Sequence, residues 1–415
     1  MRGRVHRVGG SIGVFPRRGR AWIVLAGLVL SLPALGLGGG DDSLLVRTDL
    51  PWSVRIAESF LARHPGAVTY DSATPDRRWN YEQGLMLTAF LRTGEKTGDE
   101  RYVQFVRANI DQYVDERGVI RTYDPATYNL DNIAPGRALL ALYRRTGEQK
   151  YRSAADSLRR QLRDQPRTRE GGFWHKKIYP YQMWLDGLYM AGPFYAEYAV
   201  QFGDSAALED VVSQFVRVEK HTHDPATGLL YHAWDASRQQ RWSDSLTGRS
   251  PNFWSRAMGW YAMGLVDVLD VLPPDHRGRK QLLRILNRLA GALWRVRDAR
   301  TSLWYQLTAK GRVKGNYLEA SGSAMFAYAF ARGANKGYLP KIYRDRARRV
   351  FQGIVQHLMT VDPRGLVNLH RTVRVGGLGG SPYRDGSIAY YLSEPVRTND
   401  MKGVGPLLLA AIELE

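Results

Sequence analysis

Apolar residues along most of the chain recur at steps of three and four, the spacing that lines one face of an α-helix. The pattern is clearest in residues 194–202 and 257–272. Long runs in which apolar and polar residues alternate, which would predict β-strands, are absent. From residue 50 onward the sequence therefore predicts an all-α protein.

Short polar breaks that contain glycine divide this helical pattern into pairs. In each pair an apolar helix runs into the break, and a second helix opens near a tyrosine or leucine. The breaks fall within residues 91–102, 142–151, 198–204 and 331–343. Each of them predicts a helical hairpin.

A second recurring phrase follows each hairpin and consists of an acidic residue, a tight turn and a short apolar pair. It begins at Asp115, Glu170, Asp224, Asp298 and Asp362. Glycine and proline in these phrases suit tight turns. A repeated supersecondary unit indicates a repeat-built fold, and five such returns together with the terminal helices predict six hairpins. Closed into a ring, these hairpins form an (α/α)6 barrel.

The ring arrangement predicts where each helix lies and where a site would be. Inner helices are buried on both sides, so they should be apolar nearly all round, as residues 183–191 and 320–329 are. All return loops should lie on one rim, where they lead into the next inner helix. Catalytic residues are therefore expected in these loops or just after them.

Composition agrees with a large folded enzyme or binding protein. The chain has 415 residues, more than the roughly 250–300 that one ordinary core accommodates. Hydrophobic residues make up 44% and charged residues 24%, which excludes wholesale disorder. The absence of cysteine excludes a disulfide scaffold, a thiolate metal site and a cysteine nucleophile.

The net charge of +19 leaves nucleic acid, an anionic membrane surface and an anionic substrate as partners to consider. Many arginines lie in helix-like runs such as residues 157–160 and 344–349, which is typical of a solvated outer face. No nucleic-acid-binding motif is present, so no nucleic-acid partner is expected. An acidic ligand suits the basic charge.

Residues 1–40 are set apart from the barrel. Arginines precede the apolar stretch 21–38, and small residues close it, the order of a secretory signal peptide. An uncleaved membrane anchor is the alternative, although Pro33 argues against a straight spanning helix. No later segment is apolar over a membrane-spanning length. We expect a secreted or periplasmic protein in which residues 41–415 form a single barrel domain.

Polar and aromatic residues gather at the predicted return loops. The clusters are residues 79–84, 128–132, 172–187, 231–235, 253–260 and 383–386. Within the third cluster, Asp186 lies in an otherwise apolar run. A carboxyl group with apolar neighbours loses hydration, which raises its pKa, as a general acid at neutral pH requires. A helix cap or a buried aspartate held by backbone donors is the structural alternative.

The remaining candidates have structural alternatives as well. Asp131 is placed to cap the helix entered after Pro135. His175 and His232 lie beside aromatic residues, where histidines also serve purely structural roles.

Trp254, Arg256 and Trp260 fall near one another on a helix. Indole faces stack on sugar rings and arginine binds carboxylates through a fork. Interior tryptophans and a surface ion pair would give the same pattern.

Motifs for cofactors and metals are absent from the sequence. There is no H-E-x-x-H, no pair of histidines at ligand spacing and no acid cluster. No dinucleotide fingerprint, P-loop or nucleophile elbow occurs. The glycine-rich run 376–380 lacks the lysine and preceding strand of a phosphate loop. We therefore expect neither a metal nor an organic cofactor.

Six segments in order, spanning roughly residues 79–411, carry a family resemblance: WNYEQGLML, NLDN, GGFWHKKIYPYQMWLDGLYMAGPF, NFWSRAMGWYAMGLVDVL, EASGSAMFAYAFARG and DGSIAYYLSEPVRTNDMKGVGPLLLA. With them the sequence resembles the unsaturated rhamnogalacturonyl hydrolases of glycoside hydrolase family 105, relatives of the unsaturated glucuronyl hydrolases. The fold of that family is an (α/α)6 barrel, which agrees with the hairpin count.

The resemblance implies a reaction and a set of residues. Such enzymes remove the 4,5-unsaturated uronic acid that polysaccharide lyases leave at a non-reducing end, by protonating C4 and adding water at C5. By resemblance, Asp186 corresponds to the catalytic acid and base. Residues that would line the pocket are Asp131, His175, His232, Trp254, Arg256 and Trp260.

Physical roles for these residues can be argued beside the resemblance. Arg256, and with it Lys176, would bind the uronate carboxylate. Asp131 would hold ring hydroxyls and keep Asp186 protonated by charge repulsion. The two tryptophans would stack on the flat unsaturated ring, and His232 would position water or a hydroxyl.

Three alternatives stay open at the level of sequence. The first is an unsaturated glucuronyl hydrolase that acts on ulvan-type oligosaccharides, since no motif encodes the leaving sugar. An inverting glycosidase for saturated sugars would use Asp131 and Asp186 as a carboxyl pair roughly 6.5–9.5 Å apart. A catalytically silent sugar-binding protein would keep the tryptophans and would not need a protonated Asp186.

Overall fold

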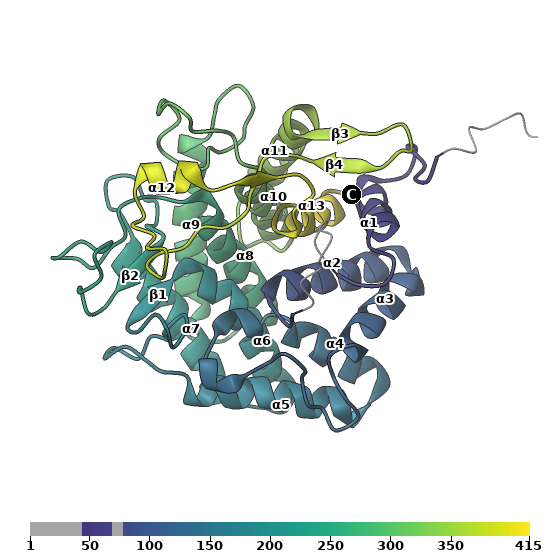
Figure 1. Ribbon diagram of the computed structural model, residues 1–415, viewed down its shortest axis with the longest axis horizontal. Coiled ribbons are helices and arrows are strands. Elements are labelled where there is room, and N and C mark those ends of the chain that lie inside the picture. The colour runs from purple at the N-terminus through teal and green to yellow at the C-terminus, as the bar shows by residue number, and fades with distance from the viewer. Residues whose placement is uncertain (1–43, 69–77) are drawn as a thin grey trace, which may run out of the picture. The chain divides into compact units, whose positions relative to one another are not determined.

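The computed structural model describes residues 44–68 and 78–415. The predicted signal or anchor, residues 1–40, lies outside these ranges. Helices dominate the described chain (Figure 1), as the sequence predicts, and the strands are two or three residues long. None of the helices in the described ranges is both long and apolar enough to cross a membrane.

Six of the described helices are buried on nearly every side and pack against one another in a ring. They are α2 (Tyr81–Thr97), α4 (Gly136–Thr146), α6 (Leu185–Phe202), α8 (Ser255–Val271), α10 (Ala320–Asn335) and α13 (Met401–Leu414). Six other helices, which are more exposed than the inner ones, pack outside the ring. They are α1 (Trp52–Arg63), α3 (Glu100–Asp111), α5 (Gln149–Asp164), α7 (Ser205–Thr222), α9 (Arg279–Val296) and α11 (Ile342–Leu358). The predicted (α/α)6 barrel is confirmed.

The sixth helix pair joins segments from the two ends of the described chain. Helix α13 packs between α10 and α2, and α1 covers it from outside (Figure 1). The Glu415 carboxylate accepts hydrogen bonds from the Ser53 backbone N–H at 2.9 Å and from the Ser53 hydroxyl at 2.5 Å. At the other end of α13, Lys402 Nζ lies 3.0 Å from Glu82 Oε1 on α2. These polar contacts close the ring.

The glycine breaks are placed correctly in two hairpins and shifted in two. Gly147 and Gly203 end their helices in the left-handed conformation, as glycine readily does. Gly94 and Gly333 instead lie inside helices, and α2 continues to a left-handed Gly98. A Cβ atom at Gly94 would lie 3.1 Å from a side chain of α3, so this glycine permits close packing within the hairpin.

The return loops explain the recurring acidic phrase. Side chains at four returns accept hydrogen bonds from backbone N–H groups of the turn that follows: Asp115, Asp224, Asp298 and Asp362. At the second return Thr168 has this role through its hydroxyl, which accepts from Gly172 N–H at 3.0 Å. Glu170, which the sequence pattern assigned to the turn, lies 3.0 Å from His221 Nε2 instead.

Short strands and turns shape the rim where the inner helices begin. Strand β1 (Gln182–Trp184) pairs antiparallel with β2 (Ala233–Asp235), with Met183 opposite Trp234. Two further antiparallel pairs lie elsewhere: β3 (Met359–Val361) with β4 (Val367–Leu369), and β5 (Thr372–Val373) with β6 (Val396–Arg397). The single-turn helices are η1 (Pro125–Thr127) and η2 (Leu130–Asn132), and α12 (Ile388–Ser393) is short. The β1–β2 pair brings the second and third returns together.

Buried charges lie between the inner helices. Asp267 on α8 is 1% exposed. Its carboxylate accepts from Arg137 at 2.6 Å and from the Tyr328 hydroxyl at 2.5 Å, and Arg92 lies 3.4 Å away. These partners come from α2, α4 and α10, so one carboxylate links four inner helices. Buried charges of this kind are stable only when paired.

Candidate active site

Asp186 is placed by the junction between β1 and α6. Strand β1 leads directly into the helix, and the backbone N–H of Leu185 donates to the carbonyl of His232 at 3.1 Å. Asp186 therefore lies in the first turn of α6, where unpaired N–H groups give the helix end a partial positive charge. The residue is 9% exposed. No hydrogen bond to its side chain is formed within the described part of the chain.

His232 approaches Asp186 from the neighbouring return. Its Nε2 atom lies 3.2 Å from Asp186 Oδ2, without the alignment of a full hydrogen bond. On the other side of the imidazole ring, Nδ1 lies 2.7 Å from the hydroxyl of Tyr391 on α12. The histidine is fully buried. The structure thus brings two predicted residues together and adds a third, Tyr391, that was not among the predicted site residues.

A second polar group forms around Asp131 in η2. Lys176 Nζ lies 2.5 Å from Asp131 Oδ2, and His175 Nε2 lies 3.4 Å from Oδ1. Burial opposes the ionisation of Asp131, but Lys176 and His175 outweigh this effect and hold its pKa well below the usual range. Asp131 is therefore an ion-paired carboxylate. It does not cap the helix entered at Pro135, because α4 has no side-chain cap. Asn129 caps η2 instead, by accepting from the backbone N–H of Asp131 at 3.0 Å.

This pairing changes two roles expected from the sequence. Lys176 is engaged by Asp131 in the structure, so it is not available as a free clamp for a uronate carboxylate. The same lysine offsets the charge of Asp131, which weakens the repulsion that was expected to keep Asp186 protonated.

Trp184 connects the two polar groups. Its ring is parallel to His175, with centroids 4.7 Å apart and an angle of 8° between planes. It meets His232 edge-on at 5.4 Å. The indole N–H donates to Gln182 Oε1 at 3.0 Å, which fixes the ring. The sequence placed Trp184 in a cluster of interest but assigned it no role.

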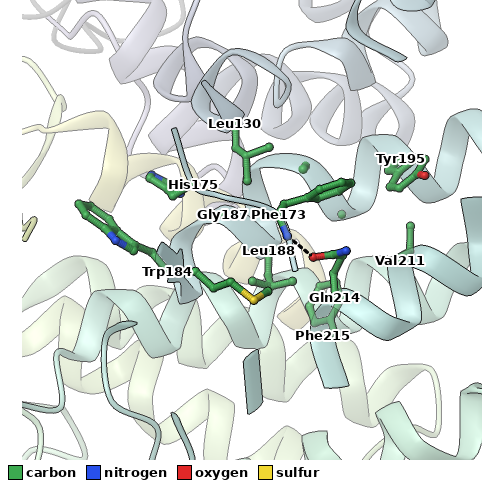
Figure 2. A pocket seen from close by; sticks show the side chains of 13 residues that line it. Leu130, Phe173, His175, Trp184, Gly187, Leu188, Tyr195, Val211, Gln214 and Phe215 are labelled. Carbon is green, nitrogen blue, oxygen red and sulfur yellow. Dashed lines mark hydrogen bonds between the residues drawn. The ribbon is translucent and has the colours of Figure 1, made fainter. Parts of the chain in front are cut away.

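An apolar cavity lies behind this layer, between α6 and α7 (Figure 2). His175 and Trp184 form part of its wall, and Leu188, Phe173 and Phe215 line it further in. The cavity holds about 20 Å³ of space, which is room for one water molecule. Asp186 and Asp131 do not line it, so this cavity is separate from the polar groups that carry the chemistry.

Trp254 and Arg256 lie at the start of α8, next to His232. The rings of Trp254 and His232 are 4.8 Å apart, and Arg256 Cζ lies 5.0 Å from the Trp254 ring. Arg256 is 1% exposed, so it does not form the surface ion pair considered from sequence. Its Nη2 donates to the Val373 carbonyl at 2.7 Å, while Nη1 has no hydrogen-bond partner among the described residues.

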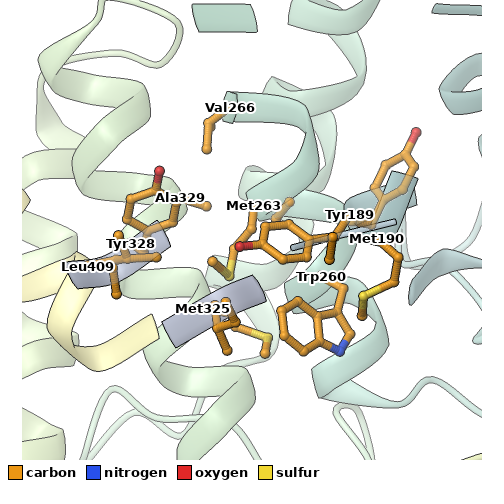
Figure 3. Close-up of a cluster of buried hydrophobic side chains, with 14 of the residues drawn as sticks. Tyr189, Met190, Trp260, Met263, Val266, Met325, Tyr328, Ala329 and Leu409 are labelled. Carbon is orange, nitrogen blue, oxygen red and sulfur yellow. The ribbon is translucent and has the colours of Figure 1, made fainter. Parts of the chain in front are cut away.

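Trp260 lies apart from the other candidates, in the packed interior (Figure 3). Its ring is 4.7 Å from Tyr189 and 6.0 Å from Tyr81, and Met325 is nearby. Trp254 and Trp260 are each 1% exposed. Neither indole offers an open face to a sugar ring in this structure, so the stacking expected from sequence is not what the geometry shows.

Residues 52–415 match the family profile described as Glycosyl Hydrolase Family 88. The match covers nearly all of the described chain. This protein belongs to Glycosyl Hydrolase Family 88. It is therefore a glycoside hydrolase.

Individual proteins of known structure or activity are similar to this chain to different degrees. A family 105 glycoside hydrolase from C. acetobutylicum ATCC 824 is 44% identical, with a TM-score of 0.84 over 88% of this chain and 99% of that one. The unsaturated rhamnogalacturonyl hydrolase YesR of Bacillus subtilis is 28% identical over 260 residues, 61% of this chain and 70% of that protein. An unsaturated glucuronyl hydrolase from Bacillus sp. GL1, with 14% identity and a TM-score of 0.65, shares the fold.

For metal ions, the geometry of this family 88 protein gives a negative finding. Within residues 44–68 and 78–415, no three or more His, Cys, Asp or Glu side chains are grouped so as to hold an ion. The carboxyl groups near the rim are instead engaged by a lysine and by histidines.

Proposed function

We propose that the protein removes the 4,5-unsaturated uronic acid from the non-reducing end of lyase-generated oligosaccharides, with Asp186 as both acid and base. The reaction hydrates the C4–C5 double bond of an enol ether. The product is a hemiketal that opens and expels the neighbouring sugar. Membership of family 88 supports the class of reaction, and the arrangement of carboxyl groups supports the residue.

The observation that carries this proposal is the contrast between two neighbouring carboxyl groups. Both oxygens of Asp131 face a basic side chain, at 2.5 Å and 3.4 Å. Asp186 faces His232 through one oxygen, and Oδ1 has no partner in the described chain. An ion-paired carboxylate with a lowered pKa is a weak base. One carboxyl group is therefore left to exchange protons, which favours hydration over an inverting reaction with two active carboxyl groups.

The steps require one proton donor that is regenerated. Neutral Asp186 gives its proton to C4, and positive charge develops at C5 and the ring oxygen. The new Asp186 carboxylate then takes a proton from the water that attacks C5. The C4–H and C5–O bonds are formed, and the acid is restored.

Arg256 is our candidate for the uronate carboxylate. Its buried Nη1 has no hydrogen-bond partner within residues 44–68 and 78–415, and an unsatisfied buried donor calls for an explanation such as a ligand. We assign the ring hydroxyls of the substrate to Asp131, His175 and Lys176. We assign the region around C5 to the neighbourhood of His232 and Trp254.

Unsaturated rhamnogalacturonan disaccharides are the substrate we favour, because the name of the Bacillus subtilis relative specifies that activity. The basic charge of the chain suits an acidic oligosaccharide. We also propose that the protein acts outside the cytoplasm, on the strength of the signal-like residues 1–40.

The test follows the ultraviolet absorbance of the conjugated double bond. Purified protein is incubated with lyase products of rhamnogalacturonan, of ulvan and of glycosaminoglycans in parallel. We expect absorbance to fall fastest with rhamnogalacturonan products and not at all with Asp186→Asn. The control is Asp275→Asn, which changes an exposed aspartate.

Each arm of that test has a distinct meaning. A faster fall with ulvan products would move the substrate to glucuronyl oligosaccharides. Near-normal turnover by Asp186→Asn would remove Asp186 from the chemistry. Release of sugar from saturated glycosides, without a change in absorbance of any lyase product, would establish the inverting alternative.

A further inference from the structure

Tyr391 carries a buried hydroxyl that the proposed mechanism does not use. The residue lies on α12 and is 0% exposed. Its hydroxyl lies 2.7 Å from His232 Nδ1, which is its one hydrogen-bond partner in the described part of the chain. The two residues are separated by 159 positions in sequence. The contact therefore depends on the fold and on the placement of α12.

The surroundings hold Tyr391 in place. Its ring lies 5.9 Å from Trp254 and 6.1 Å from His232. Gln306 joins the same group, because its side chain accepts from the Trp254 indole N–H at 3.1 Å and donates to the Tyr391 carbonyl at 3.4 Å. The hydroxyl is thus fixed from both the ring and the backbone.

The direction of the hydrogen bond follows from the number of partners. Burial raises the pKa of Tyr391 well above its ordinary value, so the hydroxyl keeps its proton. A buried O–H with no partner costs free energy, and Nδ1 of His232 is the acceptor within reach. If Nδ1 accepts, a neutral imidazole ring must carry its hydrogen on Nε2. The Nε2 atom that carries this hydrogen lies 3.2 Å from Asp186 Oδ2.

We infer that Tyr391 is a positioning residue that fixes the Nε2–H tautomer of His232, so that His232 holds Asp186 Oδ2 and the proton given to substrate leaves from Oδ1. This inference rests on the proposed function for its catalytic part. The tautomer itself is a property of the free protein. It assigns different tasks to the two oxygens of one carboxyl group.

The proton transfers balance under this assignment. Before reaction, Asp186 carries its proton on Oδ1, and Oδ2 lies 3.2 Å from the protonated Nε2 of His232. When Oδ1 gives the proton to C4, the carboxylate charge favours a hydrogen bond from Nε2–H to Oδ2, because charge-assisted hydrogen bonds are the stronger ones. The attacking water then returns a proton to Oδ1. His232 and Tyr391 neither gain nor lose a proton.

Nitrogen NMR of histidine-labelled protein tests the tautomer without any substrate. The His232 signals, among those of 9 histidines, are identified by their loss in His232→Gln. We expect a protonated Nε2 and an unprotonated Nδ1 at neutral pH. A hydrogen on Nδ1 of wild-type protein would overturn the inference outright, whatever the substrate proves to be.

Tyr391→Phe tests the role of the hydroxyl, since it keeps the aromatic ring. We expect kcat to fall by roughly 10- to 100-fold with KM within about twofold, the scale seen when a functional histidine loses the partner of its second ring nitrogen. The matched control is Tyr390→Phe on the same short helix. It removes a hydroxyl that accepts a hydrogen bond from the Gly377 N–H at 2.9 Å. Thermal unfolding of both variants separates lost activity from lost folding.

Replacement of His232 provides an independent readout. The side-chain NH2 of glutamine can stand in for Nε2–H, whereas that of asparagine lies nearer the position of Nδ1. We expect His232→Gln to retain more turnover than His232→Asn. Equal losses in the two variants, or unchanged turnover and tautomer in Tyr391→Phe, would contradict the inference. Failure of wild-type protein to act on any lyase product would instead reject the proposed function and leave the NMR result standing.

Discussion

Lys176 Nζ lies 2.5 Å from Asp131 Oδ2, so the lysine next to His175 neutralises the carboxylate that the sequence offered as a partner for Asp186. The pair comes from two different return loops. Its formation distinguishes the carboxyl groups at this rim: Asp131 is ion-paired, whereas Asp186 has no lysine or arginine beside it in the described chain. The proposed roles, substrate binding by Asp131 and proton transfer by Asp186, depend on this ion pair.

Lys176→Met should destabilise the protein most at neutral pH, by about 1.5–3 kcal/mol, the range for a hydrogen bond to a charged group. The folded-state pKa of Asp131 is lowered, so its stabilising contribution is present above the unfolded value near 3.9 and is lost as pH falls toward the folded value. Without Lys176 the buried carboxyl has a higher pKa and opposes folding at pH 7. Urea unfolding measured from pH 7 down to about pH 2 should show the difference in unfolding free energy between the two proteins narrowing as the pH falls below about 4.

The control for that series is Lys177→Met, which changes an exposed lysine one residue along. Its stability should follow that of wild type across the same pH range. A loss in Lys176→Met that does not depend on pH would show that packing of the lysine stem, rather than charge, accounts for the effect.

Asp267→Asn should lower the free energy of unfolding by about 3–5 kcal/mol, because removing one member of a buried ion pair leaves its partners uncompensated. Two arginines, Arg137 and Arg92, would lose their shared carboxylate. Denaturant unfolding provides the measurement, with the exposed Asp275→Asn expected within about 0.5 kcal/mol of wild type. Stability equal to wild type would mean that the asparagine and water replace the network without cost.

Two glycine substitutions should have opposite signs. A Cβ at Gly84 on α2 would lie 2.5 Å from the backbone nitrogen of Pro135, so Gly84→Ala must push two chain segments apart and destabilise the barrel. Gly291 on α9 has no neighbour closer than 3.7 Å, and Gly291→Ala should stabilise by about 0.5–1 kcal/mol through helix propensity. Melting temperatures of the two variants decide this, and a shift of the same sign in both would contradict it.

Arg256→Lys should weaken substrate binding by roughly tenfold or more, since lysine lacks the two-pronged geometry that suits a carboxylate. Calorimetric titration of unsaturated disaccharide into an Asp186→Asn background isolates binding from turnover. An unchanged Kd would show that the unpartnered Nη1 of Arg256 has no part in binding the uronate.

The repeat of helix pairs could be predicted because it is written into the chain as local spacing. The turn aspartates, such as Asp115 and Asp362, were visible for the same reason, since each bonds to residues within its own loop. The exact ends of the helices were harder to predict from the sequence. Gly94 and Gly98 are equivalent as local signals, and packing against α3 decides that the helix continues through the first.

The sequence predicted which residues belong to the candidate site better than it predicted how they contact one another. Sequence alone indicated Asp186, His232, Asp131 and His175, because polar residues in aromatic return loops are unusual. It could not show that Lys176 would pair with Asp131. Burial of Trp260 in the interior also depends on helix rotation within the ring, which one helix's pattern does not define.

Tyr391 illustrates the limit most clearly. It follows another tyrosine, Tyr390, and nothing local distinguishes the two. Their difference arises from the position of α12 in the fold, which brings the hydroxyl of Tyr391 to His232 and that of Tyr390 to Gly377. Such long-range contacts require the assembled barrel.

The pairing of α1 with α13 has a consequence for the order of events on the ribosome. Helix α1 is synthesised long before α13, the helix that it covers. Until α13 is synthesised, the apolar surfaces of α2 and α10 that it covers have no neighbour. The growing chain is then an incomplete ring with an exposed apolar edge, which favours aggregation. Closure joins segments far apart in sequence, which is slow. Chains interrupted before residue 401 should therefore be clients for chaperones and proteases rather than smaller working enzymes.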